Sequence, residues 1–127
     1  MLDMGKNICK NYFVKRIITI LSILILFSPL LISSDKKGDA EKNLKFGVMA
    51  SQKGLWKEAI YRWKRVIELD PTNWKAYNNL AVAYEREGMF NEALNLYQIA
   101  LQYSNDNIYV KKNYQACLSI IERKEKK

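Results

Sequence analysis

Apolar positions follow two different patterns along the chain. Residues 17–32, IITILSILILFSPLLI, are apolar on every side of a helix, interrupted only by a threonine, two serines and a proline. From about residue 39 onward, apolar residues return every three to four positions, which is the spacing of amphipathic helices. The two patterns together predict an all-α domain preceded by one hydrophobic N-terminal helix. Helices of the domain are expected at 39–53, 56–69, 73–87, 90–103 and 107–123.

The amphipathic part of the chain repeats itself. Residues 40–73 align with residues 74–107 without a gap, at a period of 34 residues. Self-similarity at this period is typical of a helix-turn-helix unit whose copies stack. One unit cannot bury its apolar face alone, so stacking supplies the missing contacts. The matched pairs include Gly54 with Gly88, Trp56 with Phe90, Ala59 with Ala93, Trp63 with Tyr97 and Asn73 with Asn107.

The matched residue types have physical roles in such a hairpin. A glycine ends the first helix of each copy, at Gly54 and Gly88, where the chain needs a left-handed residue. An alanine, Ala59 or Ala93, is expected where the two helices approach most closely. The residue before a proline avoids helical angles, so the second helix of the first copy should end at Asp70. N-caps of the helices that follow are expected at Asn73 and Asn107.

The second copy, LAVAYEREGMFNEALNLYQIAL, resembles the tetratricopeptide repeat (TPR) family. The family's signature positions hold Leu80, Ala81, Tyr84, Gly88, Phe90, Ala93, Tyr97 and Ala100. The first copy is similar through Phe46, Gly47, Ala50, Gly54, Trp56, Ala59, Trp63, Val66 and Pro71. The copies depart from the family pattern at Ala50, Val66 and Asn105. The resemblance implies a TPR-like α-hairpin solenoid with repeats at 40–73 and 74–107, then a capping helix and charged tail over 108–127.

The resemblance also implies a function and a site. Members of this family are non-catalytic adaptors or scaffolds that bind a protein or peptide on a concave surface, which the first helix of each repeat lines. Asparagine amides on that surface can pair with a peptide backbone, and cations can receive acidic groups. The candidate binding residues are Lys45, Lys75, Asn78, Asn79, Arg86, Lys112 and Asn113, beside Val48, Gln52, Val82 and Tyr109. The family's carboxylate clamp for chaperone tails is not carried over, because its positions hold Leu44, Val48, Tyr109 and Asn113.

Composition narrows the classes of function. The chain has no histidine, and its two cysteines, Cys9 and Cys117, lack a metal-ligand spacing. No nucleophile motif or phosphate-binding loop is present, so we expect neither an enzyme nor a cofactor or metal site.

The charge and the length of the chain bear on its partners. A formal net charge of +8 favours anionic partners and leaves binding of an anionic polymer or a membrane surface as the alternative function. No basic helix face and no interleaving of basic and aromatic residues stands out, so nucleic acid is not the expected partner. About three repeats are normally needed for stability, so a chain with two and a half could gain stability from a partner chain, including a second copy in a homo-oligomer.

The N-terminal segment has the layout of a targeting signal. Cations, an apolar core and then small polar residues follow one another, which is typical of a secretory signal peptide. An uncleaved anchor stays open, although a 16-residue helix spans only about 24 Å of the roughly 30 Å hydrocarbon core. In either interpretation, residues 1–34 are the signal peptide or membrane anchor and residues 35–39 are a short linker. Both predict that the repeat domain lies outside the cytoplasm (periplasmic), free or anchored to the membrane. The upstream cations are Lys6, Lys10, Lys15 and Arg16.

Overall fold

The computed structural model describes Lys15 and residues 35–126 of the chain. The chain divides into two compact units, Met1–Asp35 and Lys36–Lys127, of which the second contains the repeats. The predicted signal peptide or anchor therefore lies outside the described residues, apart from Lys15.

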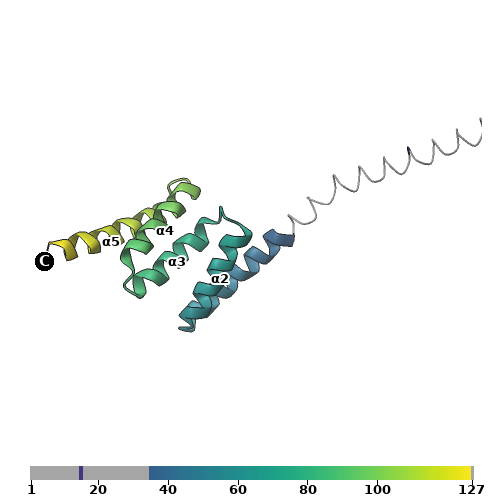
Figure 1. Ribbon diagram of the computed structural model, residues 1–127, viewed down its shortest axis with the longest axis horizontal. Coiled ribbons are helices and arrows are strands. Elements are labelled where there is room, and N and C mark those ends of the chain that lie inside the picture. Colours follow the sequence, from purple (N-terminus) through teal and green to yellow (C-terminus); the bar gives the residue numbers. More distant parts are fainter. Residues whose placement is uncertain (1–14, 16–34, 127) are drawn as a thin grey trace, which may run out of the picture. The chain divides into compact units, whose positions relative to one another are not determined.

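The described part of the second unit consists of helices and turns, without a strand. A first helix covers residues 35–52. It is followed by α2 (Trp56–Leu69), α3 (Trp74–Arg86), α4 (Phe90–Tyr103) and α5 (Ile108–Glu125). Successive helices lie side by side, with α3 packed on both α2 and α4, and α5 on α4 (Figure 1). The all-α solenoid and its expected helix ranges are confirmed, with one difference: residues 35–39, expected to be a linker, are already helical.

Each hairpin bends at its glycine. Gly54 and Gly88 have φ angles of 76° and 80°, in the left-handed region that only glycine adopts without a steric cost. Around each of them the backbone closes a Schellman motif, in which an N–H donates to the carbonyl five residues earlier. The N–H of Leu55 donates to the carbonyl of Ala50 at 2.9 Å, and the N–H of Met89 does the same to Tyr84 at 2.9 Å. The sequence prediction for both glycines is therefore confirmed.

The turns between repeats use side-chain caps. Asn73 accepts a hydrogen bond from the N–H of Ala76 at 3.3 Å, and Asn107 accepts one from the N–H of Tyr109 at 3.0 Å. Both predicted N-caps are thus confirmed. At the repeat position of Pro71, Asn105 has a φ of 53°, a conformation that asparagine tolerates better than most residues.

The core forms where the helices of each hairpin cross. Ala59 and Ala93 have no exposed surface, and the rings of Trp63 and Tyr97, one turn further on, are buried beside them. Two buried clusters result, one around Trp63 and one around Tyr97, and Tyr84 packs against both. The alanines are therefore where the sequence placed them, in the closest crossings.

The turn after α2 depends on one carboxylate. Asp70 accepts hydrogen bonds from the N–H and the hydroxyl of Thr72 at 3.1 and 2.7 Å, and from the amide of Asn73 at 3.1 Å. Burial by itself raises the pKa of Asp70, but the bonds from Thr72 and Asn73 outweigh it, so the pKa is lower than the ordinary value of 3.8. The carboxylate form is thus favoured by folding.

Replacement of Asp70 by alanine is expected to destabilise the domain by about 1 kcal/mol at neutral pH, since three hydrogen bonds to one carboxylate are lost. A folded-state pKa below the unfolded value of 3.8 adds stability that is fully present above that value and is lost as pH falls through the lower pKa. Urea unfolding measured from neutral pH down to about pH 3 should show the two proteins converging at the acidic end. Asp35→Ala, which removes an exposed carboxylate with no hydrogen bond to the described residues, is the matched control. A constant difference at all pH values would contradict this role of Asp70.

Candidate functional site

The candidate site is built from three helices, residues 35–52, α3 and α5. The first two are the first helices of the two repeats, and α5 is the capping helix at the corresponding position. Their sequences place residues of similar polarity at the same repeat position, 34 residues apart. Lys45, Asn79 and Asn113 form one such column, and Val48 and Val82, both partly exposed, form another beside it. We call six of the seven predicted residues the groove face: Lys45, Lys75, Asn78, Asn79, Lys112 and Asn113. The seventh, Arg86, lies apart from them and is described below.

Three asparagines of the groove face are joined across two helices. The amide nitrogen Nδ2 of Asn113 on α5 donates to Oδ1 of Asn78 on α3 at 3.0 Å. The Nδ2 of Asn78 then donates to Oδ1 of Asn79 at 3.4 Å. At the ends of this amide chain, the Nδ2 donor of Asn79 and the Oδ1 acceptor of Asn113 have no partner among the described residues. One donor and one acceptor are what a peptide unit needs for its C=O and N–H.

Cations lie on both sides of the amide chain. Lys45 on the first helix and Lys112 on α5 are exposed and form no ion pair within residues 35–126. Lys75 lies with its ammonium 5.7 Å from the centroid of the Trp74 ring. It also lines a hollow of 310 Å³, together with Lys37, Ala40, Glu41, Leu44, Asp70, Thr72, Asn73 and Trp74.

One acidic residue near the groove face, Glu85, is already engaged in a hydrogen bond within the domain. Glu85 accepts a hydrogen bond of 2.6 Å from the hydroxyl of Tyr97. Burial of Tyr97 and its bond to Glu85 raise the pKa of the tyrosine far above its ordinary value, so the hydroxyl stays protonated as the donor. The groove face is therefore polar and basic, with Glu41 as the remaining nearby carboxylate that no hydrogen bond or ion pair engages in the described part of the chain.

Arg86 is separated from the other candidate residues. Its guanidinium lies 4.7 Å from the centroid of the Trp56 ring, so it covers the bend of the first hairpin instead of facing the amide chain. With Leu55, Trp56 and neighbouring residues it lines an open pocket of 870 Å³. The sequence alone could not show this, because the direction of a long side chain depends on which ring lies within its reach.

A second pocket occupies the same repeat position at the bend of the next hairpin. It measures 460 Å³ and includes Met89 and Phe90, the repeat partners of Leu55 and Trp56. Here the cation is Lys124, whose ammonium lies 4.0 Å from the centroid of the Phe90 ring. These pockets at the bends were missed in the sequence, although the exposed apolar pair Leu55 and Met89 could have indicated them.

The cysteine in the described part of the chain, Cys117, is shielded from solvent. Cys117 is fully buried, and burial followed by the charge of Glu85 raises the pKa of its thiol to about 11. The thiol donates to the carbonyl of Phe90 at 3.4 Å, so Cys117 behaves as a core residue. Over the described residues, no helix combines the length and the hydropathy required to span a bilayer.

Comparison with known proteins agrees with this architecture. The family model "Tetratricopeptide repeat" matches residues 74–107, and the model "TPR repeat" matches residues 51–88. The TPR repeat-containing protein YpiA of Bacillus subtilis is 36% identical over 73 residues, which cover 58% of this chain. The chain spans only 17% of the length of YpiA.

Two solved structures share the fold. The second TPR of Spaghetti (RPAP3), bound to the HSP90 peptide SRMEEVD, superposes with a TM-score of 0.67 at 19% identity, covering 72% of this chain and 83% of that one. The C-terminal TPR-containing domain of a Plasmodium falciparum protein superposes with a TM-score of 0.67 at 22% identity, covering 97% and 86%. Together with the spacing and packing described above, the two family models show that residues 51–107 contain tetratricopeptide repeats.

Proposed function

We propose that the chain is a non-catalytic interaction module that binds an extended, acidic segment of another protein on its groove face. The observation that carries the proposal is the amide chain Asn113–Asn78–Asn79, whose ends, the amino group of Asn79 and the Oδ1 of Asn113, have no partner among the described residues. Stacked helical repeats generally use such extended concave surfaces to bind their partners. The unpaired Lys45 and Lys112 beside the amides favour a peptide with carboxylates over a neutral or basic one.

The mode of binding differs from a carboxylate clamp. The RPAP3 domain was solved with a peptide that ends in EEVD, so a related fold accommodates an acidic segment. At the clamp positions of this chain, however, stand Leu44, Val48, Tyr109 and Asn113. We therefore propose that recognition relies on backbone pairing by the amides, with the cations adding attraction that salt would weaken.

Selection from a displayed peptide library against the full chain, followed by calorimetry, tests this function. Selected peptides should be rich in Asp and Glu and bind at micromolar strength. The pair of changes Asn79→Ala and Lys112→Ala should weaken binding about tenfold, because a donor to the peptide backbone and a cation are lost. Lys57→Ala, which removes an exposed cation of α2 that forms no ion pair among the described residues, is the matched control and should leave affinity unchanged. Retention of full affinity by the groove variant, with intact helical content by circular dichroism, would place the binding surface elsewhere.

We further propose that this module works outside the cytoplasm, beside a membrane. The support is the order of cations, apolar run and small polar residues before residue 35. Cleavage near Ser34 would release the domain, and retention would anchor it. The intact mass of the native protein distinguishes these outcomes, and protease treatment of intact cells against lysed cells tests the topology. Three results together would contradict export: a full-length mass, protection from protease in intact cells, and recovery of the protein only in the soluble fraction of lysed cells.

A further inference from the structure

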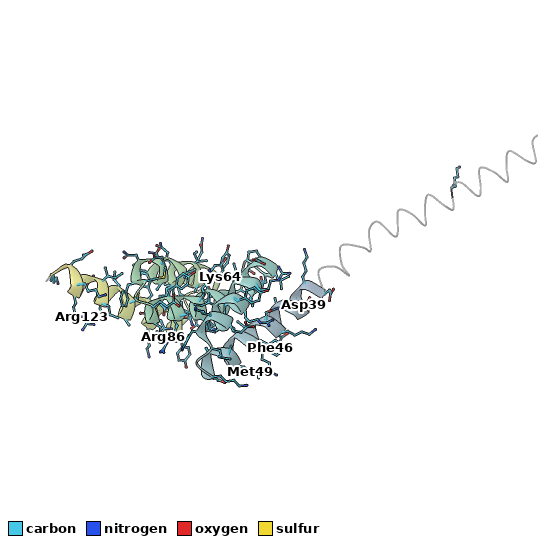
Figure 2. The ribbon with its side chains drawn as sticks, turned by 60° about the horizontal axis from the view of Figure 1, so that its bottom comes forward. Asp39, Phe46, Met49, Lys64, Arg86 and Arg123 are labelled. Atoms are coloured by element: carbon cyan, nitrogen blue, oxygen red, sulfur yellow. The ribbon has the colours of Figure 1, made fainter. Side chains whose placement is uncertain are left out.

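Within residues 35–126, no helix precedes the first one in the stack, whereas each later repeat packs on the helix before it. On α3, the residues Ala76, Leu80 and Ala83 are buried against the preceding helix, α2. Their repeat partners on the first helix are Lys42, Phe46 and Met49. With no preceding helix in the described residues, Phe46 and Met49 remain 52% and 41% exposed. Figure 2 shows Phe46 and Met49 along the first helix, at the end of the stack opposite to Arg123 on α5.

An arginine connects this exposed helix to aromatic side chains. The guanidinium of Arg62 on α2 lies 5.7 Å from the centroid of the Phe46 ring and 5.6 Å from that of Tyr61, which is itself exposed. Glu58 and Asn43 hold the guanidinium, accepting hydrogen bonds of 2.7 and 3.2 Å. Two helices thus combine an apolar and aromatic surface with a fixed cation. We call it the free-end face: Lys42, Phe46, Met49, Tyr61 and Arg62.

The surroundings of the free-end face carry an excess of positive charge. Two carboxylates near it are paired, Asp39 with Lys42 at 3.6 Å and Glu58 with Arg62 at 2.7 Å, and Glu41 is the nearby carboxylate that no ion pair engages in the described part of the chain. Lys45 and Lys53 are exposed on the same helix and its following turn, and form no ion pair in the described part of the chain. A second copy placed here would bring like charges together, and a purely apolar partner would bury the cations. An anionic, half-apolar partner satisfies both groups.

We propose that the free-end face lies on an anionic lipid bilayer, with Phe46, Met49 and Tyr61 at the level of the headgroups and the lysines toward the lipid phosphates. Aromatic rings and methionine bury apolar surface at a membrane interface while long cationic side chains reach its charges. This inference rests on the membrane location proposed above. In the sequence, only residues 33 and 34 separate the apolar run 17–32 from the described part of this helix, so retention of that run as an anchor would keep the face near lipid. Lys45 lies at the border of the two surfaces, whereas the amide chain of the groove face is on α3 and α5 and would stay open to its peptide.

Spin labelling of the full chain in lipid nanodiscs tests the contact. A nitroxide is attached through Met49→Cys in a Cys9→Ser background, and in a second sample through Ser119→Cys on the exposed side of α5. Nanodiscs contain phosphatidylcholine alone or mixed with phosphatidylglycerol. Collisions of a water-soluble nickel chelate with the label at position 49 should fall severalfold in the anionic discs, and oxygen collisions should rise. High salt should reverse the change, and the label at position 119 should report none of it.

A matched pair of variants separates lipid contact from other causes. Phe46→Glu should abolish the protection of position 49 with only a small change in the thermal midpoint, because the Phe46 ring is 52% exposed. Tyr103→Glu, at another exposed aromatic on α4, should leave the protection intact. Equal chelate access in both lipids would overturn the inference, and so would dipolar broadening that identifies a second copy as the occupant. A chain that never enters the nanodiscs overturns the membrane location as well, whereas peptide binding by the same sample still reports on the groove face.

Discussion

Replacement of Trp63 by alanine is expected to remove about half of the protein's stability at 25 °C or more. The indole is 3% exposed and lies in the buried cluster that joins the first helix, α2 and α3. Truncation of a large aromatic residue in a core typically costs about 3–5 kcal/mol, because transfer energy is lost and a cavity remains. A small domain has a total stability of only about 5–10 kcal/mol. Urea and thermal unfolding followed by circular dichroism should show a lost or strongly shifted transition.

Trp63→Phe is the control that keeps a ring in the same place. It should cost far less than the alanine variant, on the order of 1–2 kcal/mol. The smaller ring also removes the Nε1 of Trp63, a buried donor with no hydrogen-bond partner, so part of the packing loss is offset. In the second repeat the equivalent hydroxyl of Tyr97 has Glu85 as its acceptor, whereas the first repeat has Ser51 at that position, and Ser51 donates to Val48 instead. An unchanged midpoint for Trp63→Ala would mean that the first helix is not held through this ring.

The parts of the fold that the sequence predicted are those that recur. A helix boundary set by Gly54 is set again by Gly88, and the crossing at Ala59 recurs at Ala93, so two independent copies support each assignment. These choices are also local, since a left-handed φ or a proline acts on its own turn. Residues 35–39 have no repeat partner within the two copies, and there the expected linker proved to be helical.

The details of the candidate site were not predictable, because they depend on side chains that the fold brings together. The amides of Asn78 and Asn113 are 35 residues apart in the chain and meet only when α5 packs against the second hairpin. Arg86 faces Trp56 because a ring lies within its reach, which no spacing rule contains. The basic and aromatic residues of the free-end face are likewise contributed by two helices, so no single stretch of sequence displays them together.

Gly47→Ala is expected to destabilise the domain by about 2–3 kcal/mol, although alanine is the better helix former. A Cβ at this buried position would lie 2.7 Å from Cδ1 and 3.0 Å from Cε2 of Trp63, and closer still to its Nε1. Because the ring is enclosed in the core, it can move only by disturbing its neighbours. Gly38→Ala is the opposite case on the same helix, since nothing lies within 4 Å of its added Cβ. That change should stabilise by about 0.5–1 kcal/mol through backbone entropy alone.

A double-mutant cycle between Gly47 and Trp63 tests the cause directly. In a Trp63→Phe background, Gly47→Ala should lose most of its effect, since the smaller ring leaves room for the methyl group. The second repeat supports this expectation, because there the buried Ala81 is combined with Tyr97, a ring smaller than the indole. The residue sizes at these two positions therefore compensate each other: the first repeat combines glycine with the larger tryptophan, and the second combines alanine with the smaller tyrosine. Additive free energies of unfolding in the cycle, measured by urea denaturation, would show that the two side chains do not constrain each other.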